Sequence, residues 1–160
     1  MKKVFIISIL VLGLSSCLSL SYNVQHKQYD SIERPFTTDT VRFYEDMSFS
    51  ISVEKTILSN YEYYTIMIRY TGSSWFFMDG DVTIQADDNI IKISDNTPDR
   101  NILYGGNVSE VIRATIKKED LLKIANSEIL RIQFFGSPIA IDDKGIEFIK
   151  QFCDEFNNEQ

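Results

Sequence analysis

Side chains that commonly carry out catalysis are scarce in this chain of 160 residues, which has one histidine, two cysteines and one tryptophan. The histidine, His26, has no serine or cysteine nucleophile motif beside it. Pairs of carboxylates can hydrolyse glycosides, but 23 acidic residues supply such pairs by chance in any fold. We therefore predict no catalytic residue and no cofactor.

Proline and glycine are also few, with three and seven residues, and 44% of the residues are apolar. This composition argues against a disordered or fibrous chain and is typical of a folded protein. At this length one domain is expected.

The apolar run at the start of the chain is too short to span a bilayer. Lys2 and Lys3 precede residues 4–14, which only Ser8 interrupts. A spanning helix needs ~20 apolar residues, whereas a charged start followed by a shorter apolar stretch is typical of a secretory signal.

A cysteine closes this run, in the sequence Leu14-Ser15-Ser16-Cys17. An apolar residue, two small residues and then cysteine resemble the lipobox of bacterial lipoproteins. The resemblance implies cleavage between Ser16 and Cys17, so that residues 1–16 are a signal peptide. It also implies that Cys17 becomes the first residue of the mature chain and carries a diacylglycerol thioether and fatty-acyl chains such as palmitate. Two or three acyl chains give a stable membrane anchor, whereas one is marginal.

Two other interpretations of the start remain open. Cleavage a few residues later, near Ser19 or Ser21, would remove Cys17, and residues 4–20 left uncleaved would form an anchor by themselves. An ordinary cleavage site has a small-x-small pattern, which leucines interrupt here, so the lipidated form is favoured.

Loss of residues 1–16 removes two lysines and no acids, which leaves 14 basic and 23 acidic residues and a formal charge of −9. Such a surface repels nucleic acids and anionic headgroups, so nucleic acid is not expected as a partner and the acyl chains must supply the membrane attachment. Leu18 follows Cys17 where aspartate would favour inner-membrane retention, so we expect the outer membrane, facing the periplasm, in a Gram-negative cell. Only Cys153 remains besides Cys17, so no intrachain disulfide is expected in the mature domain.

Residues 17–38 show no sustained periodicity and contain Pro35, which predicts a lipidated tether that holds the domain away from the membrane. A first strand within the tether is the alternative. His26 lies in this stretch, so a catalytic triad built on it would require the tether to fold onto the domain. Residues 39–160 then form a single globular domain rich in β-structure.

Alternating apolar and polar residues predict strands over the next hundred residues. The most regular alternation covers residues 47–54, with Met47 first on its apolar face, and a second covers residues 61–70. Ser59-Asn60 lies between them and predicts a hairpin.

Aspartate and glycine turns divide the rest of the predicted sheet. Asp79-Gly80 predicts a hairpin between residues 75–78 and 82–86, and Asp87-Asp88-Asn89 predicts the next turn. Further strands are expected at residues 90–93, 102–104, 108–116, 128–135 and 139–141.

Two helices are expected, one at residues 118–126 and one that begins at Asp142 or Asp143. The second carries an apolar stripe that includes Ile149 and Cys153, so it needs an apolar surface to cover and Cys153 is expected to be buried rather than reactive. We therefore predict an α+β fold, mainly antiparallel. Six to eight strands form a curled sheet, sandwich or incomplete barrel, with one short helix and the C-terminal helix packed on the sheet.

Six aspartates lie in or near the predicted turns between residues 79 and 99, and their oxygens suit calcium. Gly80 directly follows the first aspartate and no glutamate closes the sequence, which departs from an EF-hand loop. Asp-Gly and Asp-Asp-Asn are also the sequences that hairpin turns prefer. We predict turns here and no metal site.

Aromatic side chains gather around the second strand and the residues after it. Tyr64 and Tyr70 share a face with isoleucines and are expected in the core, whereas the neighbouring tyrosines fall on the opposite face. Exposed aromatics anchor protein interfaces and sugar-stacking surfaces, although strands also use aromatics simply to fill a core. The candidate ligand or partner surface consists of Tyr61, Tyr63, Trp75 and Phe76.

These features predict a lipid-anchored protein of the cell envelope with a non-catalytic binding or structural domain. Its expected partner is an envelope protein or a glycan. An envelope hydrolase or enzyme accessory subunit that uses loop carboxylates is one alternative. An inhibitor or immunity-type protein for a basic partner is the other.

Overall fold

A computed structural model describes residues 20–29, 36–78, 80–94, 96–136 and 138–157. Within these residues the fold is α+β and mostly antiparallel, with ten strands in two open sheets and two α-helices. The predicted fold class is confirmed, although the strands outnumber the six to eight expected. The signal peptide and Cys17 lie outside the described residues.

The larger sheet has six strands in the order β1-β2-β3-β4-β8-β7, and every neighbouring pair is antiparallel. These strands are β1 (Val24–Tyr29), β2 (Phe36–Glu45), β3 (Phe49–Leu58), β4 (Tyr61–Gly72), β7 (Asp99–Ile102) and β8 (Val108–Ile116). The predicted hairpin at Ser59-Asn60 joins β3 to β4, and Ser59 adopts a left-handed φ of 57° in the turn. A short 3₁₀ helix, Tyr104–Gly106, follows β7.

The predicted tether is wrong for the residues that form β1 and the start of β2. β1 pairs with β2 along its whole length, from Val24 opposite Val41 to Tyr29 opposite Phe36. Before β1, Leu20 and Tyr22 pack against the hydrophobic core. The sequence pattern did not reveal this strand, because β1 lies at the edge of the sheet and five of its six residues are exposed. The strand forms by pairing with β2 and has no apolar face that alternation could detect.

The smaller sheet has four strands in the order β10-β9-β5-β6. They are β5 (Val82–Ala86), β6 (Asn89–Ile93), β9 (Leu130–Gln133) and β10 (Ile139–Ile141). The turn at Asp87-Asp88 joins β5 to β6 as predicted. The hairpin predicted at Asp79-Gly80 is wrong, because residues 75–78 form no strand and β5 pairs with β6 and β9 instead.

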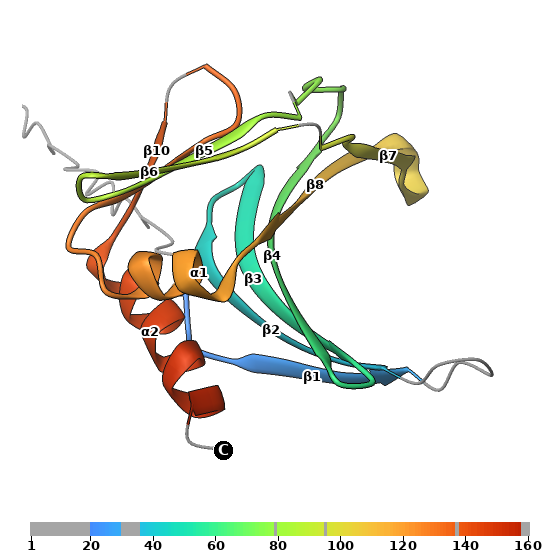
Figure 1. The fold of residues 1–160 in the computed structure, drawn as a ribbon. Coiled ribbons are helices and arrows are strands. Elements are labelled where there is room, and N and C mark those ends of the chain that lie inside the picture. Colours follow the sequence, from blue (N-terminus) through green and yellow to red (C-terminus); the bar gives the residue numbers. More distant parts are fainter. Residues whose placement is uncertain (1–19, 30–35, 79, 95, 137, 158–160) are drawn as a thin grey trace, which may run out of the picture.

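Helices α1 (Lys118–Ala125) and α2 (Asp143–Asn157) confirm the two predicted helices. Both lie on one side of the six-stranded sheet, and the four-stranded sheet lies across one end of it (Figure 1). No helix among the described residues has the length and apolar character needed to cross a membrane.

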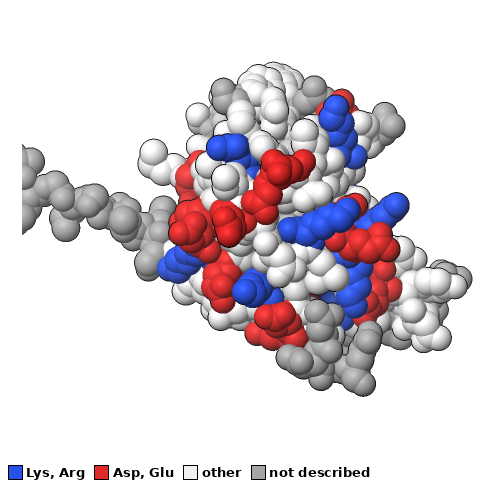
Figure 2. Space-filling model, turned by 60° about the vertical axis from the view of Figure 1, so that its left-hand side comes forward, with Lys and Arg blue, Asp and Glu red and all other residues white. Residues whose placement is uncertain are grey.

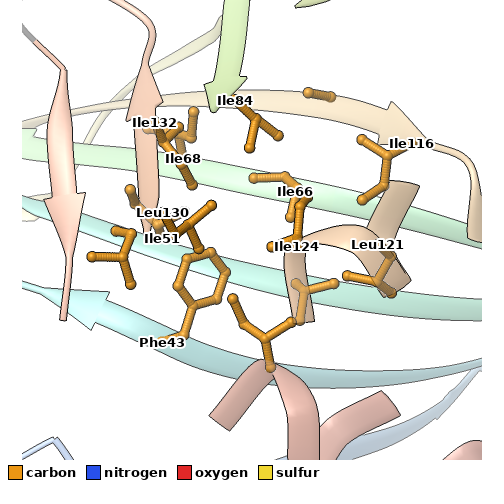
Figure 3. Close-up of a cluster of buried hydrophobic side chains, with 14 of the residues drawn as sticks. Phe43, Ile51, Ile66, Ile68, Ile84, Ile116, Leu121, Ile124, Leu130 and Ile132 are labelled. Carbon is orange, nitrogen blue, oxygen red and sulfur yellow. The ribbon is translucent and has the colours of Figure 1, made fainter. Parts of the chain in front are cut away.

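One hydrophobic core joins both sheets and both helices. Figure 3 shows Phe43 and Ile51 of the large sheet facing Ile84 and Ile132 of the small sheet, with Ile124 of α1 beside them. Each such side chain stabilises the fold by roughly 1.5–3 kcal/mol through burial. Ile149 and Cys153 of α2 are buried in the same core, as the apolar stripe predicted.

The strand predicted at residues 47–54 has the right alternation, but its start at Met47 is wrong. Its side chain is 96% exposed, because β3 begins only at Phe49. Oδ1 of Asp46 accepts hydrogen bonds from the backbone N–H groups of Ser48 and Phe49, which bends the chain into a turn before the strand starts.

Candidate functional site

The structure separates the tyrosines of β4 as their alternation predicted. Tyr61 and Tyr63 are 68% and 44% exposed, whereas Tyr64 is buried and Tyr70 is half-buried against Phe49. The hydroxyl of Tyr64 donates a hydrogen bond to Glu62.

The four aromatic residues proposed as one surface do not lie together. Tyr61 and Tyr63 are at the start of β4, and Trp75 and Phe76 follow its end. β4 has 12 residues, so the two pairs are separated by roughly 35 Å along the strand. The structure therefore contains two aromatic regions rather than one.

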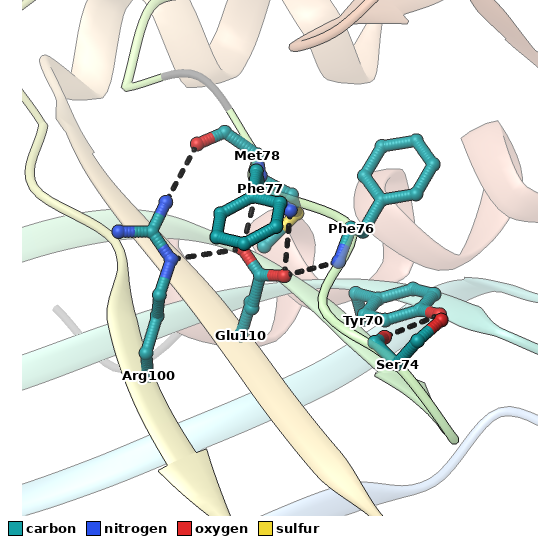
Figure 4. A network of polar contacts seen from close by, with 7 residues as sticks. All are labelled: Tyr70, Ser74, Phe76, Phe77, Met78, Arg100 and Glu110. Carbon is teal, nitrogen blue, oxygen red and sulfur yellow. Dashed lines mark hydrogen bonds and ion pairs between the residues drawn. The ribbon is translucent and has the colours of Figure 1, made fainter.

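The second region is a loop that a buried glutamate holds in place. We call residues 73–78 the aromatic loop. Oε1 of Glu110, in β8, accepts hydrogen bonds from the backbone N–H groups of Phe76 and Phe77 at 2.6 and 2.8 Å, and Oε2 accepts one from Met78 at 2.9 Å. Three successive N–H groups that converge on one carboxylate form an anion-binding nest of backbone donors. Figure 4 shows the carboxylate between this loop and Arg100.

Arg100 of β7 completes the cage around the carboxylate. Its Nε lies 3.2 Å from Oε2 of Glu110, and its Nη2 donates to the carbonyl oxygen of Met78 at 3.3 Å. Burial alone would raise the pKa of Glu110, which is fully buried, but the backbone donors and Arg100 outweigh it and lower that pKa below its usual value. The carboxylate is therefore ionised, and it ties β7, β8 and the loop together.

The held loop points one phenylalanine inward and one outward. Phe76 packs against Phe49, Tyr70 and Phe135, with ring centroids 4.7–5.3 Å apart. Phe77 is 65% exposed, and the guanidinium of Arg100 lies 5.7 Å from its ring centroid. Phe77 has a backbone φ of 60°, in the left-handed region that residues other than glycine seldom adopt.

Exposed apolar residues also lie in the segment that follows Arg100, whose guanidinium lies over the ring of Phe77. Ile102, Leu103 and Tyr104 come directly after Arg100 and Asn101 in β7 and the 3₁₀ helix, and all three are exposed. We call Phe77 and these three residues the apolar rim. Such a surface, beside a fixed charged group, is typical of a protein interface.

No protein-family model, curated protein or solved structure matches the chain.

Sequence reasoning missed Glu110 and Arg100 as members of this site, and it did not include Phe77 among the four residues of the candidate surface. The signal for Glu110 was its position: it falls in phase with Ile112 and Ala114 on the apolar face of a strand. A carboxylate in such a row needs buried partners. Its three backbone donors lie more than thirty residues away in the chain and Arg100 lies ten residues away, so no local pattern identifies them.

His26 lies in β1 and not in a tether. Its Nδ1 is 2.5 Å from Oδ1 of Asp39, the residue directly opposite in β2. A histidine and aspartate catalyse acyl transfer when the other ring nitrogen contacts a nucleophile. No side chain among the described residues hydrogen-bonds to Nε2 of His26, so the pair as it stands joins two strands.

A second buried charge lies at the opposite end of β4. The side chain of Lys55 is 4% exposed, and its Nζ lies 3.1 Å from Glu62 and 4.1 Å from the ring centroid of Phe156. Burial would raise the pKa of Glu62, but hydrogen bonds from Tyr64 and Lys55 outweigh it and lower that pKa. Nearby, burial raises the pKa of Cys153 to about 11, so its thiol is a poor nucleophile at neutral pH.

Two of the loop aspartates that were considered for calcium have structural partners. Oδ1 of Asp87 accepts hydrogen bonds from the N–H groups of Glu128 and Ile129, and Asp99 pairs with Arg113. Within the described residues, no group of three or more His, Cys, Asp or Glu side chains is arranged to hold a metal ion. Asp79 and Asp95 lie outside the described residues. Figure 2 shows acidic and basic side chains interleaved over the face that it presents.

Proposed function

We propose that this chain is a lipid-anchored protein of the bacterial cell envelope that works as a binding module and not as an enzyme. The proposed anchor is a lipid on Cys17, supported by the resemblance of residues 14–17 to a lipobox. The proposed binding surface is the aromatic loop with the apolar rim, and its proposed partner is another envelope protein.

The observation that carries the binding role is the fixed outward position of Phe77. A fully buried carboxylate and three backbone hydrogen bonds are used to hold a loop whose tip exposes a phenylalanine in a left-handed conformation. Left-handed backbone in such a residue costs roughly 1–2 kcal/mol. A loop that only connects two sheets would not need this conformation.

A fixed aromatic side chain is well suited to binding a protein. Ordering a side chain on binding costs roughly 0.5–1.5 kcal/mol, and Glu110 has already ordered this loop. Aromatic and arginine side chains are the commonest anchors of interfaces, and Phe77 lies over Arg100. The rim favours a protein over a glycan, because Ile102 and Leu103 offer no donor or acceptor for sugar hydroxyls.

Site-specific photo-crosslinking in living cells tests the binding role. A photoreactive phenylalanine analogue at Phe77 or at Tyr104 should crosslink to the same partner protein. The matched control is Tyr61, which is also aromatic and exposed but lies at the far end of β4, and it should not yield that product. Equal crosslinking from Tyr61, or none from the rim, would contradict the proposed surface.

The anchor has a separate test. Metabolic labelling with a radioactive fatty acid should mark the wild-type chain and should be lost in Cys17→Ala, while Cys153→Ala should retain the label. Labelling that survives Cys17→Ala would exclude lipidation at that residue.

A further inference from the structure

A basic groove lies on the face of the six-stranded sheet that points away from the core. Its volume is about 510 Å³, and strands β1, β2, β3, β4 and β8 all contribute to its lining. The charged residues of the lining are Lys27, Arg42, Arg69 and Arg113, with Glu45 and Glu54. Four cations against two carboxylates make the groove positive, in a chain whose net charge is −7.

The strand register makes this surface hollow between its arginines. Arg42, Ser52, Met67 and Arg113 lie side by side on four neighbouring strands, and Arg69 lies beside Ser50 in the next row. The serines of β3 have short side chains, so the arginine side chains of the flanking strands extend further from the surface of the sheet than the serines between them. Adjacent strands are ~4.8 Å apart, and β3 lies between Arg42 in β2 and Arg69 in β4. The distance between the two outer strands is therefore about twice that spacing, which leaves room for an anion between the two arginines.

Two of the four cations have no partner among the described residues. Lys27 and Arg69 are exposed, and neither forms a hydrogen bond or ion pair with any other residue in the described parts of the chain. Arg42 pairs with Glu45 at 2.7 Å and Arg113 with Asp99, but both arginine side chains remain about half exposed. Exposed ion pairs of this kind are weak and exchange readily with another anion.

The groove lies beside the point where the chain leaves for the anchor. Leu20, Ser21 and Asn23 form part of its lining, and Leu20 also packs on the core. Only three residue steps separate Leu20 from Cys17, and an extended chain covers at most ~3.6 Å per residue. A lipid on Cys17 would therefore hold the Leu20 edge of the groove within roughly 11 Å of the headgroups.

We propose that this groove binds the phosphate of an anionic phospholipid headgroup in the membrane that holds the anchor. The inference rests on the proposed lipidation of Cys17. It also reverses an expectation from composition, because the net charge predicts repulsion from anionic headgroups. The four cations are far apart in the sequence, and only the sheet brings them together.

Fluorescence quenching on vesicles tests this with the full mature protein. A dye is attached at Ser52→Cys in the groove floor or, as a control, at Asp88→Cys in the exposed β5–β6 turn. The buried thiol of Cys153 does not compete for the label at neutral pH. Headgroup-spin-labelled lipid should quench the dye at Ser52→Cys in vesicles that contain phosphatidylglycerol, but much less in pure phosphatidylcholine and less at Asp88→Cys.

Two charge-matched triple variants show whether the groove cations are responsible. Arg42→Gln/Arg69→Gln/Arg113→Gln should lower the affinity for phosphatidylglycerol by roughly fivefold for each cation removed. Lys92→Gln/Arg131→Gln/Lys150→Gln removes the same charge from exposed positions outside the groove and should have little effect. Equal loss in both variants would overturn the proposal, because net charge alone would then explain the binding.

Mass spectrometry of the same sample separates the two proposals. If Cys17 is acylated but the dye at Ser52→Cys is not quenched in anionic vesicles, the groove proposal fails and the anchor stands. If Cys17 is unmodified, the proposed anchor fails and takes the groove proposal with it. Excess inorganic phosphate should weaken the quenching more than chloride of equal ionic strength, because both phosphates would use the same cations. If inorganic phosphate binds the groove in solution but phosphatidylglycerol vesicles quench the dye at Ser52→Cys no more than phosphatidylcholine vesicles do, the groove is a site for free phosphate and the lipid source is overturned.

Discussion

Lys55 shows at the scale of one residue how this fold accommodates a buried charge. The aliphatic stem of the side chain is buried, and the ammonium is shared between a carboxylate of Glu62 and the ring of Phe156. Because its stem is buried, Lys55 contributes to stability through packing as well as through its charge. Lys118 lies 3.9 Å from Glu62 and is more exposed, so it contributes less through packing.

We expect Lys55→Ala to lower the free energy of unfolding by about 2–4 kcal/mol, because it leaves a cavity and removes the nearer of the two lysines that pair with Glu62. Lys55→Met keeps the volume and should cost less than about 1.5 kcal/mol, since Glu62 is partly exposed and water can solvate it. Urea denaturation measures both, with Lys118→Met as the surface control at about 0–0.5 kcal/mol. A loss for Lys55→Met as large as that for Lys55→Ala would show that the ion pair outweighs packing.

Glu110 predicts how the stability depends on acid. Its folded-state pKa lies below that of an unfolded glutamate. Its contribution is therefore fully present above the unfolded pKa of about 4.5 and is lost as the pH falls through the lowered folded value. Urea midpoints measured from neutral pH down to about pH 3 should fall less steeply for Glu110→Gln than for the wild type.

Glu110→Gln should also cost about 2–4 kcal/mol at neutral pH, because an amide oxygen replaces a charged acceptor of several buried donors. Glu45→Gln is the matched control, since its carboxylate pairs with Arg42 at the surface. The control should leave both the stability and its acid dependence nearly unchanged. Equal acid slopes for wild type and Glu110→Gln would contradict the role assigned to this carboxylate.

At the scale of elements, α2 depends on a close approach at Gly145. A Cβ atom at this position would lie 2.4 Å from the backbone oxygen of Phe43 in β2 and 2.6 Å from Ile141. Alanine favours helix over glycine by roughly 1 kcal/mol. The clash with backbone should nevertheless dominate, because backbone cannot rotate away.

We therefore expect Gly145→Ala to destabilise the fold by about 1–3 kcal/mol through displacement of α2 from β2. Gln151→Ala on the exposed face of the same helix should change the stability by less than about 0.5 kcal/mol. Thermal or urea unfolding compares the two. A gain in stability for Gly145→Ala would mean that α2 does not lie as close to β2 as described.

The elements that were predictable from sequence are those with a strong local pattern. Residues 108–116 and the C-terminal helix were found almost to the residue, because one alternates along a buried strand and the other carries an apolar stripe. β1 was missed because its partner, rather than its own residues, makes it a strand. The aromatic loop was mistaken for half of a hairpin, since Asp79-Gly80 signals a turn but cannot report that the chain crosses to another sheet at this point.

The candidate site was predictable only in part, for the same reason. Trp75 and Phe76 were identified by residue type, but their separation from Tyr61 follows from the length of β4. Glu110 meets the backbone of Phe76 only in the folded protein, and the groove cations become neighbours only through the pairing of the strands. Sequence patterns report local preference, and these contacts are long-range.

At the scale of the whole molecule, both sheets and both helices share one core, so we expect a single cooperative unfolding transition. Trp75, the only tryptophan, lies in the aromatic loop, whereas far-UV circular dichroism reports all the strands and helices. The two signals should change at the same urea concentration. A tryptophan transition at lower urea would show that the loop opens before the core unfolds.

The position of Glu110 in the chain also bears on the order in which the protein takes shape as it is made. Its carboxylate is 34 positions further along the chain than Phe76, the first residue that it holds. While only the first four strands have left the ribosome, Glu110 is not yet present to hold Phe76 and Phe77. The two side chains can then associate with other unfolded chains. A nascent chain stalled before β8 should therefore need chaperone protection, which a chain stalled after β8 no longer needs.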